Sequence, residues 1–240
     1  MQTIVVGNFE ATGIDREHHL KMLAERADLT NSLKQANIPF ELTDTQWPRN
    51  SYVLFNGKRL DKEQLQLYAD GGYILSHPRF TLACAEVSNP ECLPKDDPNI
   101  RYQKLQELYG KDIFILPSPD LSLNDHMSPH IDLVVLPIHQ KKILFVDHKY
   151  YFEIAKKEVD RVIQETKYKL IILPSNYQIP SFPCNSLIVE DREGLVAVTN
   201  SDRNRQFIDL LKAQGVKVIA VPFSANCSRG GSVHCATNLK

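Results

Sequence analysis

The chain has 240 residues, of which 42% are hydrophobic and 24% are charged, and these are ordinary values for a globular protein. Its formal net charge is −1, so nothing indicates a nucleic acid or an anionic membrane as a partner. No apolar run is long enough to cross a bilayer. The length allows one large domain or two small ones, and we predict a single domain over residues 1–240.

The cysteines indicate the redox compartment. They are odd in number, widely spread and without a CxxC pair, which favours reduced thiols over a disulfide framework. They are Cys84, Cys92, Cys184, Cys227 and Cys235. The N-terminal run Met1–Gly7 is short, apolar and without a basic region, so it is typical of a strand rather than of a signal peptide. We therefore expect a cytoplasmic protein.

The first hundred residues are predicted to contain one long helix and several short strands. The helix runs from Arg16 to Ala36, with Leu20, Leu23, Ala27 and Leu33 near one face. The predicted strands are 38–42, 51–55 and 73–75. The second of them leads into a hairpin turn at Asn56-Gly57, and the third follows Asp70-Gly71-Gly72. Residues 84–99 hold several prolines and polar side chains and are predicted to form a surface loop.

From residue 102 onward one sequence pattern recurs: a helix, a strand that stops at a proline, a loop and a hairpin. The predicted helices are 102–109, 151–167 and 202–214, which ends at the capping signal Gly215. The strands after them are 113–116, 170–173 and 216–221, and the hairpins pair 131–136 with 143–146 and 186–190 with 195–199. The opening segment has the same order, with Phe40-Glu41-Leu42 as its strand. Repeats of roughly 50 residues indicate a propeller or an array, because one unit cannot bury its own face.

Each repeat carries a polar or reactive residue between 8 and 14 positions beyond its strand. These residues are Asn50, His130, Asn185 and Cys235. Repeats arranged around an axis would bring equivalent positions together there. The pattern therefore predicts one site formed by four residues that lie far apart in the sequence.

The strongest candidate for chemistry is Cys235, which follows Gly230-Gly231 and has His234 beside it. The tail alone leaves open whether it is a nucleophile or a small buried residue. His130 and Asp132 lie two apart at the start of a predicted strand, so we expect both on one face of the sheet. They form either an acid/base pair for a cysteine nucleophile or a structural hydrogen-bonded pair.

Metal and cofactor motifs are missing from the sequence. His126 and His130 have HxxxH spacing, but Pro129 breaks the helix that this spacing needs. There is no CxxC, HExxH, GxGxxG or Walker pattern. We expect neither a metal nor a nucleotide cofactor. Taken alone, Asp70 is typical of a turn, while Trp47 and Arg49 are typical of packing and a structural ion pair.

Five segments together resemble one family. They are Trp47-Pro48-Arg49-Asn50, Asp70-Gly71-Gly72, His130-Ile131-Asp132, Cys184-Asn185-Ser186-Leu187 and Gly230-Gly231-Ser232-Val233-His234-Cys235-Ala236-Thr237. Their order over the whole chain is similar to that of the guanidino-group modifying enzymes of the pentein fold, which include deiminases, dimethylarginine hydrolases and amidinotransferases. The resemblance implies an α/β-propeller of five pseudo-symmetric αβ repeats around a central active site.

The resemblance also implies roles for the candidate residues. Cys235 would attack the guanidinium carbon, and His130 would protonate the departing amine and later activate water. Asp70, at a position that is often glutamate, would orient the histidine or the substrate. The substrate-binding set would be Asn50, Asp132, Arg49 and Asn185. A planar cation with several N–H donors suits carboxylates in fork geometry, and a cation beside a thiol favours the thiolate.

The sequence departs from the family pattern at three places. Asn50 replaces the aspartate that usually ends the Trp-x-Arg motif, and Tyr73 replaces the aspartate that usually follows Gly-Gly. The segment between Asn50 and Asp70 is shorter than usual, so we expect that repeat to lack its helix. These departures argue against a strict arginine deiminase. Relatives of the arginine and succinylarginine dihydrolase kind resemble this sequence in having asparagine at that place.

The predicted function is a metal-free, cofactor-free hydrolase of the guanidino group of an arginine-like substrate, acting through a covalent amidino-thioether. It is either a deiminase or a dihydrolase. The alternatives are an amidinotransferase that uses the same cysteine and a non-catalytic pentein binding module, although a scaffold would need neither His130 nor Cys235. The sequence leaves open whether the substrate is a free amino acid or a peptidyl arginine, and it does not indicate the oligomeric state.

Overall fold

A computed structural model describes residues 2–8, 14–45, 48, 52–55, 58–61, 72, 74–77, 79–84, 106–107, 112–119, 130–174, 182–202, 204–228 and 231–240. The chain divides into two compact units, and each is described here by itself. Unit 1 comprises Met1–Arg49 and Asn176–Lys240, and unit 2 comprises Asn50–Ser175. The predicted single domain stays a prediction.

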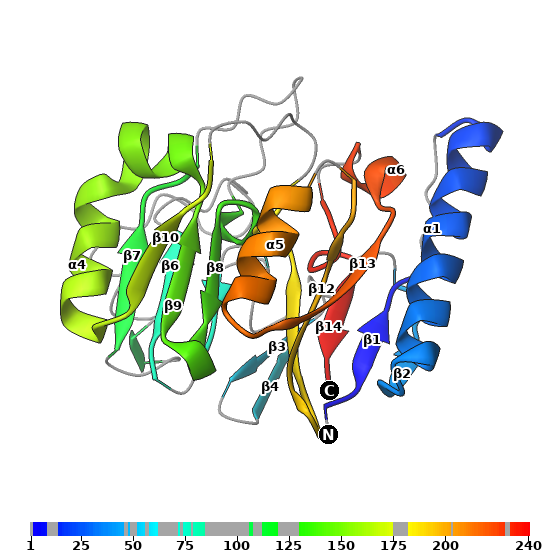
Figure 1. The fold of residues 1–240 in the computed structure, drawn as a ribbon, viewed down its shortest axis with the longest axis horizontal. Coiled ribbons are helices and arrows are strands. Elements are labelled where there is room, and N and C mark those ends of the chain that lie inside the picture. Colours follow the sequence, from blue (N-terminus) through cyan, green and yellow to red (C-terminus); the bar gives the residue numbers. More distant parts are fainter. Residues whose placement is uncertain are drawn as a thin grey trace. The chain divides into compact units, whose positions relative to one another are not determined.

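Unit 1 contains two three-stranded sheets with the strand orders β14-β1-β2 and β11-β12-β13 (Figure 1). Its strands are β1 (Ile4–Val6), β2 (Phe40–Leu42), β11 (Leu187–Asp191), β12 (Gly194–Asn200), β13 (Lys217–Val221) and β14 (Thr237–Leu239). In each sheet the central strand pairs antiparallel with one neighbour and parallel with the other. A helix connects each parallel pair, because parallel strands need a crossover connection.

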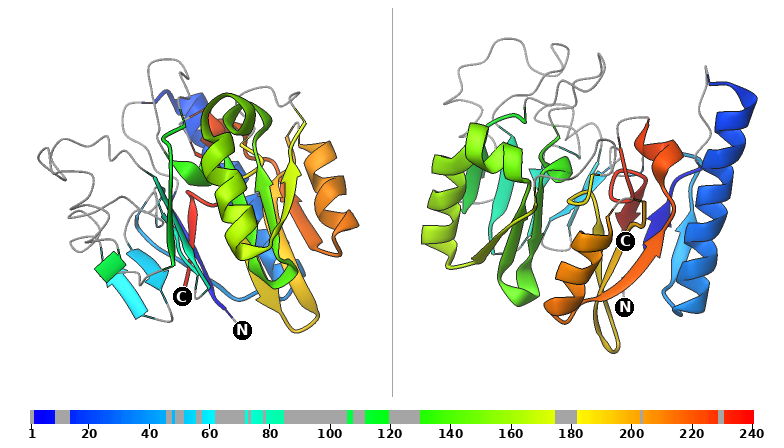
Figure 2. Two further views of the ribbon diagram at one scale, coloured as in Figure 1. Left: turned by 90° about the vertical axis from the view of Figure 1, so that its left-hand side faces the viewer. Right: turned by 45° about the horizontal axis from the view of Figure 1, so that its top comes forward.

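The helices of unit 1 are α1 (Arg16–Gln35), α5 (Arg205–Ala213) and the single turn α6 (Ser224–Cys227). The side chain of Asp15 caps α1 by accepting from the His18 amide at 2.9 Å, a contact worth about 1 kcal/mol. Gly215 follows α5 with a φ of +71°, which confirms the predicted end signal. Helix α1 packs against α6 and β13 (Figure 2).

The predicted helix Arg16–Ala36 is confirmed to within one residue. Of the four residues expected near one face, Leu33 is buried and Leu23 is half-buried, whereas the expectation is wrong for the exposed Leu20 and Ala27. The buried positions of the helix are Met22, Glu25, Leu29 and Leu33, while Leu20 is 55% exposed. These positions are three to four residues apart and form one stripe. The stripe escapes hydrophobic pattern analysis because one of its members is a glutamate.

Unit 2 contains the sheets β3-β4, β5-β6-β7 and β10-β9-β8. Its strands are β3 (Tyr52–Phe55), β4 (Lys58–Asp61), β5 (Ile74–Leu75), β6 (Thr81–Cys84), β7 (Ile113–Leu116), β8 (Val135–Ile138), β9 (Ile143–Val146) and β10 (Lys169–Ile172). The antiparallel pair β3-β4 confirms the predicted hairpin, with Phe55 opposite Lys58. Both three-stranded sheets again combine one antiparallel and one parallel pair. The predicted repeat is therefore present as four sheets of the same construction.

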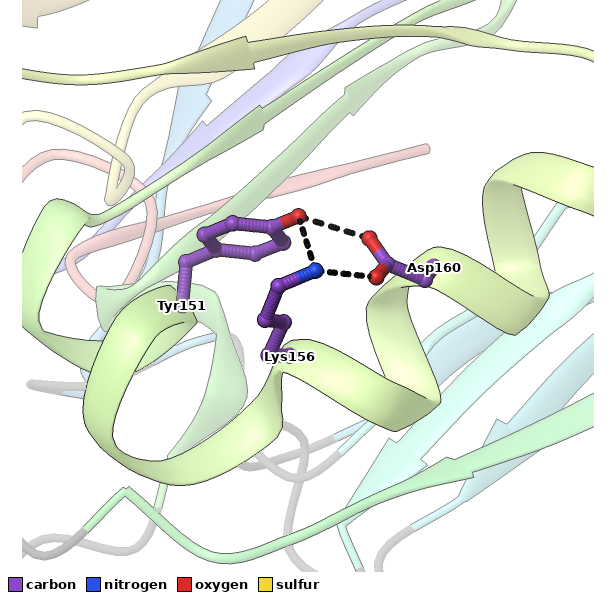
Figure 3. A network of polar contacts seen from close by, with 3 residues as sticks. All are labelled: Tyr151, Lys156 and Asp160. Carbon is purple, nitrogen blue, oxygen red and sulfur yellow. Dashed lines mark hydrogen bonds and ion pairs between the residues drawn. The ribbon is translucent and has the colours of Figure 1, made fainter.

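The predicted helix 151–167 consists of two parts, a π-helix η5 (Tyr150–Ala155) and an α-helix α4 (Lys156–Thr166). Figure 3 shows the side chains that join them. Tyr151 donates to Asp160 at 2.6 Å, and Lys156 donates to the same carboxylate at 2.5 Å. The buried Tyr150 donates from its hydroxyl to the carbonyl oxygen of Pro117 at 2.7 Å, which ties the start of η5 to the end of β7.

Several predicted elements need correction or lie outside the described residues. The predicted strand 131–136 is wrong in its first half, because Ile131–Leu133 forms the 3₁₀ turn η3 and β8 begins only at Val135. Strand β14 and helix α6 were not predicted. Most of the predicted helix 102–109 and of the predicted loop 84–99 lies outside the described residues. In the part of the chain that the structure describes, no helix is long and apolar enough to span a membrane.

Candidate active site

The predicted site residues fall into three groups. Asn185 and Cys235 belong to unit 1, and His130 and Asp132 belong to unit 2. Arg49, Asn50 and Asp70 lie outside the described residues, so their predicted roles stay predictions. The geometry of the site is therefore given for each unit separately.

In unit 1, residues 231–236 form a turn that we call the Cys235 loop, and the side chain of Asn185 holds it. The amide nitrogen Nδ2 of Asn185 donates to Sγ of Cys235 at 3.2 Å. The side-chain oxygen Oδ1 of Asn185 accepts from the backbone amides of Ser232 at 2.9 Å and Cys235 at 3.1 Å. The backbone carbonyl of Asn185 accepts from the backbone amide of His234 at 3.1 Å. One fully buried side chain thus fixes both the backbone and the sulfur of the candidate nucleophile.

Apolar contacts complete the support of this loop. Val233 and Ala236, on either side of Cys235, are 0% exposed and belong to the core of unit 1 together with Met22 and Leu29. The hydroxyl of Thr237 donates to the carbonyl of Val233 at 2.7 Å. Because close-packed core residues have little room to move, the loop is anchored on both sides of its cysteine.

A second thiol of unit 1, Cys227, is in a different environment. It is 1% exposed and its sulfur accepts from Nδ2 of Asn200 at 3.2 Å. Burial raises the pKa of Cys227 to about 12, although the Ser232 and Asn200 side chains offset part of this effect. A thiol that stays protonated at neutral pH is a poor nucleophile, so Cys227 is a structural residue.

In unit 2, residues 130–134 form what we call the His130 turn. His130 precedes the 3₁₀ turn η3, which closes through hydrogen bonds from Leu133 to His130 and from Val134 to Ile131. The amide of Asp147, just after β9, donates to the carbonyl of Val134 at 2.8 Å. The expected placement of both residues at the start of a strand is wrong, because Ile131–Leu133 forms a 3₁₀ turn and β8 begins only at Val135.

The turn nevertheless keeps His130 and Asp132 close together. A ring nitrogen of His130 and a carboxylate oxygen of Asp132 lie within 4.8 Å of each other. Asp132 is 1% exposed, whereas His130 is half-buried. A buried carboxylate beside a more accessible imidazole suits charge recognition by the first and proton transfer by the second.

The His130 ring explains why the last position of the Asp70-Gly71-Gly72 motif is glycine. A Cβ atom added to Gly72 would lie 2.8 Å from Cε1 of the His130 ring and closer still to Nδ1 and Cγ. Only glycine leaves room for the imidazole at this distance. This contact brings the third residue of the Asp70-Gly71-Gly72 motif against the first residue of the His130-Ile131-Asp132 motif.

Unit 1 has a surface groove that lies apart from the Cys235 loop. A groove of about 910 Å³ in unit 1 lies between the end of α1, the β11–β12 turn and the start of β13, and none of the predicted site residues lines it. Within each unit taken by itself, the described residues bring together no three His, Cys, Asp or Glu side chains that would hold a metal ion.

Comparison with known proteins identifies the fold. No protein-family model and no curated protein sequence matches this chain. Among solved structures, SxtG, an amidinotransferase from Microseira wollei in the saxitoxin biosynthetic pathway, matches with a TM-score of 0.71 at 13% identity, over 99% of this chain and 93% of that one. The N-terminal domain of ArgZ, an arginine dihydrolase from Cyanobacteria, matches with a TM-score of 0.69 at 13% identity, over 99% and 97% of the two chains.

The agmatine deiminase of C. jejuni gives a TM-score of 0.67 at 17% identity, over 100% of this chain and 92% of that one. A dimethylarginine dimethylaminohydrolase gives 0.66 at 11% identity, over 100% and 99%. These full-length matches show that the chain has the pentein α/β fold, which confirms the fold class that the sequence motifs indicate.

Sequence reasoning placed Asn185 among the candidates but did not predict its contacts. A separation of 50 residues lies between Asn185 and Cys235, and no periodic pattern links them. The available signal was the position of both residues at the same distance beyond their repeat strands. That signal indicated proximity, while the hydrogen-bond pattern emerged only from the structure.

Proposed function

We propose that this protein is a cysteine-dependent hydrolase of the guanidino group of an arginine-like substrate. The observation that carries the proposal is the Cys235 loop, in which the buried side chain of Asn185 donates to the sulfur of Cys235 at 3.2 Å and also accepts from the amides of Ser232 and Cys235. A hydrogen-bond donor aimed at sulfur favours the thiolate, which is the nucleophilic form. The pentein fold adds support, because its matched members act on arginine or related guanidines.

In the first half of the proposed reaction, Sγ of Cys235 forms a bond to the guanidinium carbon. One C–N π-electron pair moves to nitrogen and gives a tetrahedral adduct. His130, in its protonated form, gives a proton to the departing nitrogen, and the C–N bond breaks. The result is an amidino-thioether on Cys235 and a released amine or ammonia.

In the second half, neutral His130 takes a proton from a water molecule while the oxygen of that water adds to the amidino carbon. Collapse of this second adduct expels the thiolate of Cys235. If ammonia left first, the product is a ureido compound. Asp132 is suited to bind the guanidinium nitrogens throughout, because charge-assisted hydrogen bonds to a carboxylate are strong and directional.

Asn50 favours a dihydrolase as the finer assignment. A buried carboxylate without a cation is costly, so an aspartate at this position would disfavour a neutral ureido product. An amide can accept from a guanidinium nitrogen and can also donate to a ureido oxygen. With Asn50 the site can bind the first product again. A second attack by Cys235 then forms a thiocarbamate and releases a second ammonia, and a second water breaks the C–S bond to give a carbamate that decomposes to carbon dioxide and an amine.

Amidino transfer is the second candidate, and the match to SxtG favours it. In this case the substrate's amine leaves in the first half, and the amidino group that stays on Cys235 reacts with an acceptor amine instead of water, which breaks the C–S bond and moves the amidino group to the acceptor. Both candidates need Cys235 and His130, and they differ in the nitrogen that leaves first and in the group that attacks the intermediate.

The remaining residues receive supporting roles. We assign Asp70 to orientation of His130 or the substrate, and Arg49 and Asn50 to substrate binding. Asn185 was predicted to bind substrate, and its hydrogen bonds to Ser232 and Cys235 favour orientation of the nucleophile as its main role. A small-molecule guanidine is the expected partner. We also propose a cytoplasmic setting, since the four cysteines that the structure describes form no disulfide with one another.

A panel of guanidines tests the proposal. The purified protein is incubated with arginine, agmatine, methylated arginines and an arginine peptide, with and without an amine acceptor. Mass spectrometry then distinguishes a ureido product, loss of the amidine to a free amine, and transfer to the acceptor. No turnover of any guanidine, with no covalent adduct on Cys235, would favour a non-catalytic binding module.

The ammonia yield separates the two hydrolases. We expect two ammonia molecules per guanidine consumed, and we expect Asn50→Asp to shift the yield towards the ureido compound. One ammonia per turnover in the wild-type protein, with the ureido compound accumulating, would reject the dihydrolase assignment and leave simple deimination.

A further inference from the structure

Four consecutive backbone amides of unit 1 donate to two acidic side chains. Asp202 accepts from the amides of Phe223 and Ser224, each at 3.0 Å. Glu25 of α1 accepts from the next two, Ala225 at 2.7 Å and Asn226 at 3.0 Å. The segment that forms α6 is therefore attached to two parts of the chain that are far apart in sequence.

Burying the carboxylate of Glu25 at this place costs free energy. It is only 6% exposed, and burial raises its pKa above the ordinary value of 4.5, although the donors from Ala225 and Asn226 offset part of this effect. Its second oxygen also accepts from the side-chain amide of Asn226 at 2.6 Å. A buried glutamate that makes three hydrogen bonds to one short segment has a more specific use than general stability.

The attached segment leads directly to the candidate nucleophile. Helix α6 ends at Cys227, whose sulfur has the Ser232 and Asn200 side chains as neighbours. Ser232 is in turn bound through its amide to Asn185, the residue whose Nδ2 donates to Cys235. Phe223 and Ala225 lie in the same core as Val233 and Ala236 of the Cys235 loop. A continuous set of buried contacts thus joins Glu25 to the sulfur of Cys235.

We propose that Glu25 and Asp202, the carboxylate pair, are positioning residues for the Cys235 loop. The inference rests on the proposed function of Cys235 as the nucleophile. The pair holds α6, and Ala225 of α6 lies in the same core as Val233 and Ala236, so the Cys235 loop stays where Oδ1 of Asn185 accepts from the amides of Ser232 and Cys235. Neither carboxylate is proposed to touch the substrate.

The test uses Glu25→Gln and Asp202→Asn in the full chain, with Glu17→Gln as a matched control. Glu17 lies on the same helix, is 79% exposed and pairs only with Lys21 among the contacts described for it. Hydrogen exchange is measured for three segments: 223–228, the Cys235 loop and the β11–β12 hairpin. We expect both variants to raise exchange of the Ser232 and Cys235 amides about ten- to a hundredfold, because weaker support of α6 lets the Cys235 loop open more often and expose these amides.

Kinetics on the best guanidine of the panel give the second readout. We expect kcat to fall about ten- to a hundredfold with KM changed by less than about threefold, since small displacements of a reacting group cost rate rather than binding. Glu25→Ala should be more severe than Glu25→Gln, which keeps one acceptor oxygen. Glu17→Gln should behave as wild type in both assays.

Three outcomes would overturn the inference: wild-type exchange in both folded variants, raised exchange confined to 223–228, or raised exchange everywhere including β11–β12. The second would make the pair a local cap, and the third would make it a general stabilising contact. Because exchange is measured without substrate, the result stands apart from the chemistry. Full turnover by Cys235→Ala would reject the proposed function even if the exchange result holds.

Discussion

The Cys235 loop and the His130 turn are held in place by different kinds of contact. The loop in unit 1 is fixed by hydrogen bonds from one buried asparagine and by core residues on both sides of the cysteine. The turn in unit 2 is fixed by its own 3₁₀ hydrogen bonds, by one backbone hydrogen bond from Asp147 and by the close approach of Gly72 to the imidazole.

This difference matches what each residue is proposed to do. A nucleophile must present one atom at one place, and a polar network specifies both its position and its hydrogen-bond partner. An acid/base residue must exchange protons with a leaving group and then with water, and half-burial leaves its ring accessible. The close fit against Gly72 limits the position of the His130 ring, and the hydrogen bond from Asn185 limits that of the Cys235 sulfur.

Removal of the sulfur gives the largest expected effect. Cys235→Ala should lower turnover by roughly 10⁴–10⁶-fold, because no other group can form the covalent intermediate. The measurement is kcat on the best guanidine, together with a search for adducts by mass spectrometry. Cys84→Ala, a change of another buried thiol, is the control and should remain active. Normal turnover by Cys235→Ala would end the covalent mechanism.

Loss of the imidazole should have the next largest effect. His130→Ala should lower kcat by about 10²–10⁴-fold with a small change in KM, the usual range for general acid/base work. Asp132→Asn should instead raise KM, since it removes a charge from the substrate cation while keeping the shape of the side chain. Both are measured by steady-state kinetics. If both variants lose only affinity and reach the wild-type rate at saturation, the assigned roles are wrong.

The steric support of His130 can be tested without changing the histidine. Gly72→Ala should lower kcat about 10²-fold, because the new methyl group displaces the ring from its working position. The matched control is Gly194→Ala, where φ is +133° and no atom lies within 4 Å of the added Cβ. The control should cost stability through its backbone and leave kcat unchanged. Equal activity losses in the two variants would show that the ring contact is unimportant.

The smallest expected effect is a loss of folding free energy at acidic pH, and it involves His139. His139 lies in η4 (His139–Lys141), at the other end of β8 from the His130 turn, stacked on His77 at 3.5 Å between ring centroids. Its Nδ1 is 3.0 Å from the hydroxyl of Tyr168. Burial, with smaller effects of His77 and Arg79, lowers the pKa of His139 from 6.5 to about 3.

A lowered histidine pKa means that the unfolded chain binds the proton more readily than the folded one. The contribution of His139 is therefore complete above pH 6.5 and is lost as the pH falls from 6.5 towards 3, by about 1.4 kcal/mol per pH unit. Denaturant unfolding at pH 7 and pH 5 measures this slope. His139→Phe, which keeps an aromatic ring beside Phe80, should reduce the slope. An unchanged slope would assign the acid sensitivity to other groups.

The order of elements follows largely from the sequence alone. Hydrophobic runs ending at proline, and helices such as α5 ending at Gly215, are local signals, and local signals survive whatever the rest of the chain does. The same holds for the hairpin between β3 and β4 and for the recurrence of sheet and helix. The residue types at the candidate site were also readable, because Cys235, His130 and the glycine pair stand in short motifs.

The contacts that give these residues their environments were decided only by the tertiary structure. Strand β14 and helix α6 are too short to show a period, and β14 forms because β1, at the other end of the chain, offers it a partner. The sequence alone predicts that Glu25 lies on the surface of α1. In the structure it is buried, because the amides of Ala225 and Asn226 donate to its carboxylate and offset the cost of burial. His130 and Asp132 lie on a 3₁₀ turn rather than a strand, because closure of that turn and its bond to Asp147 outweigh the strand propensity of the isoleucine, leucine and valines around them. Such contacts join residues far apart in sequence, so local sequence patterns do not predict them or the free energy that they contribute.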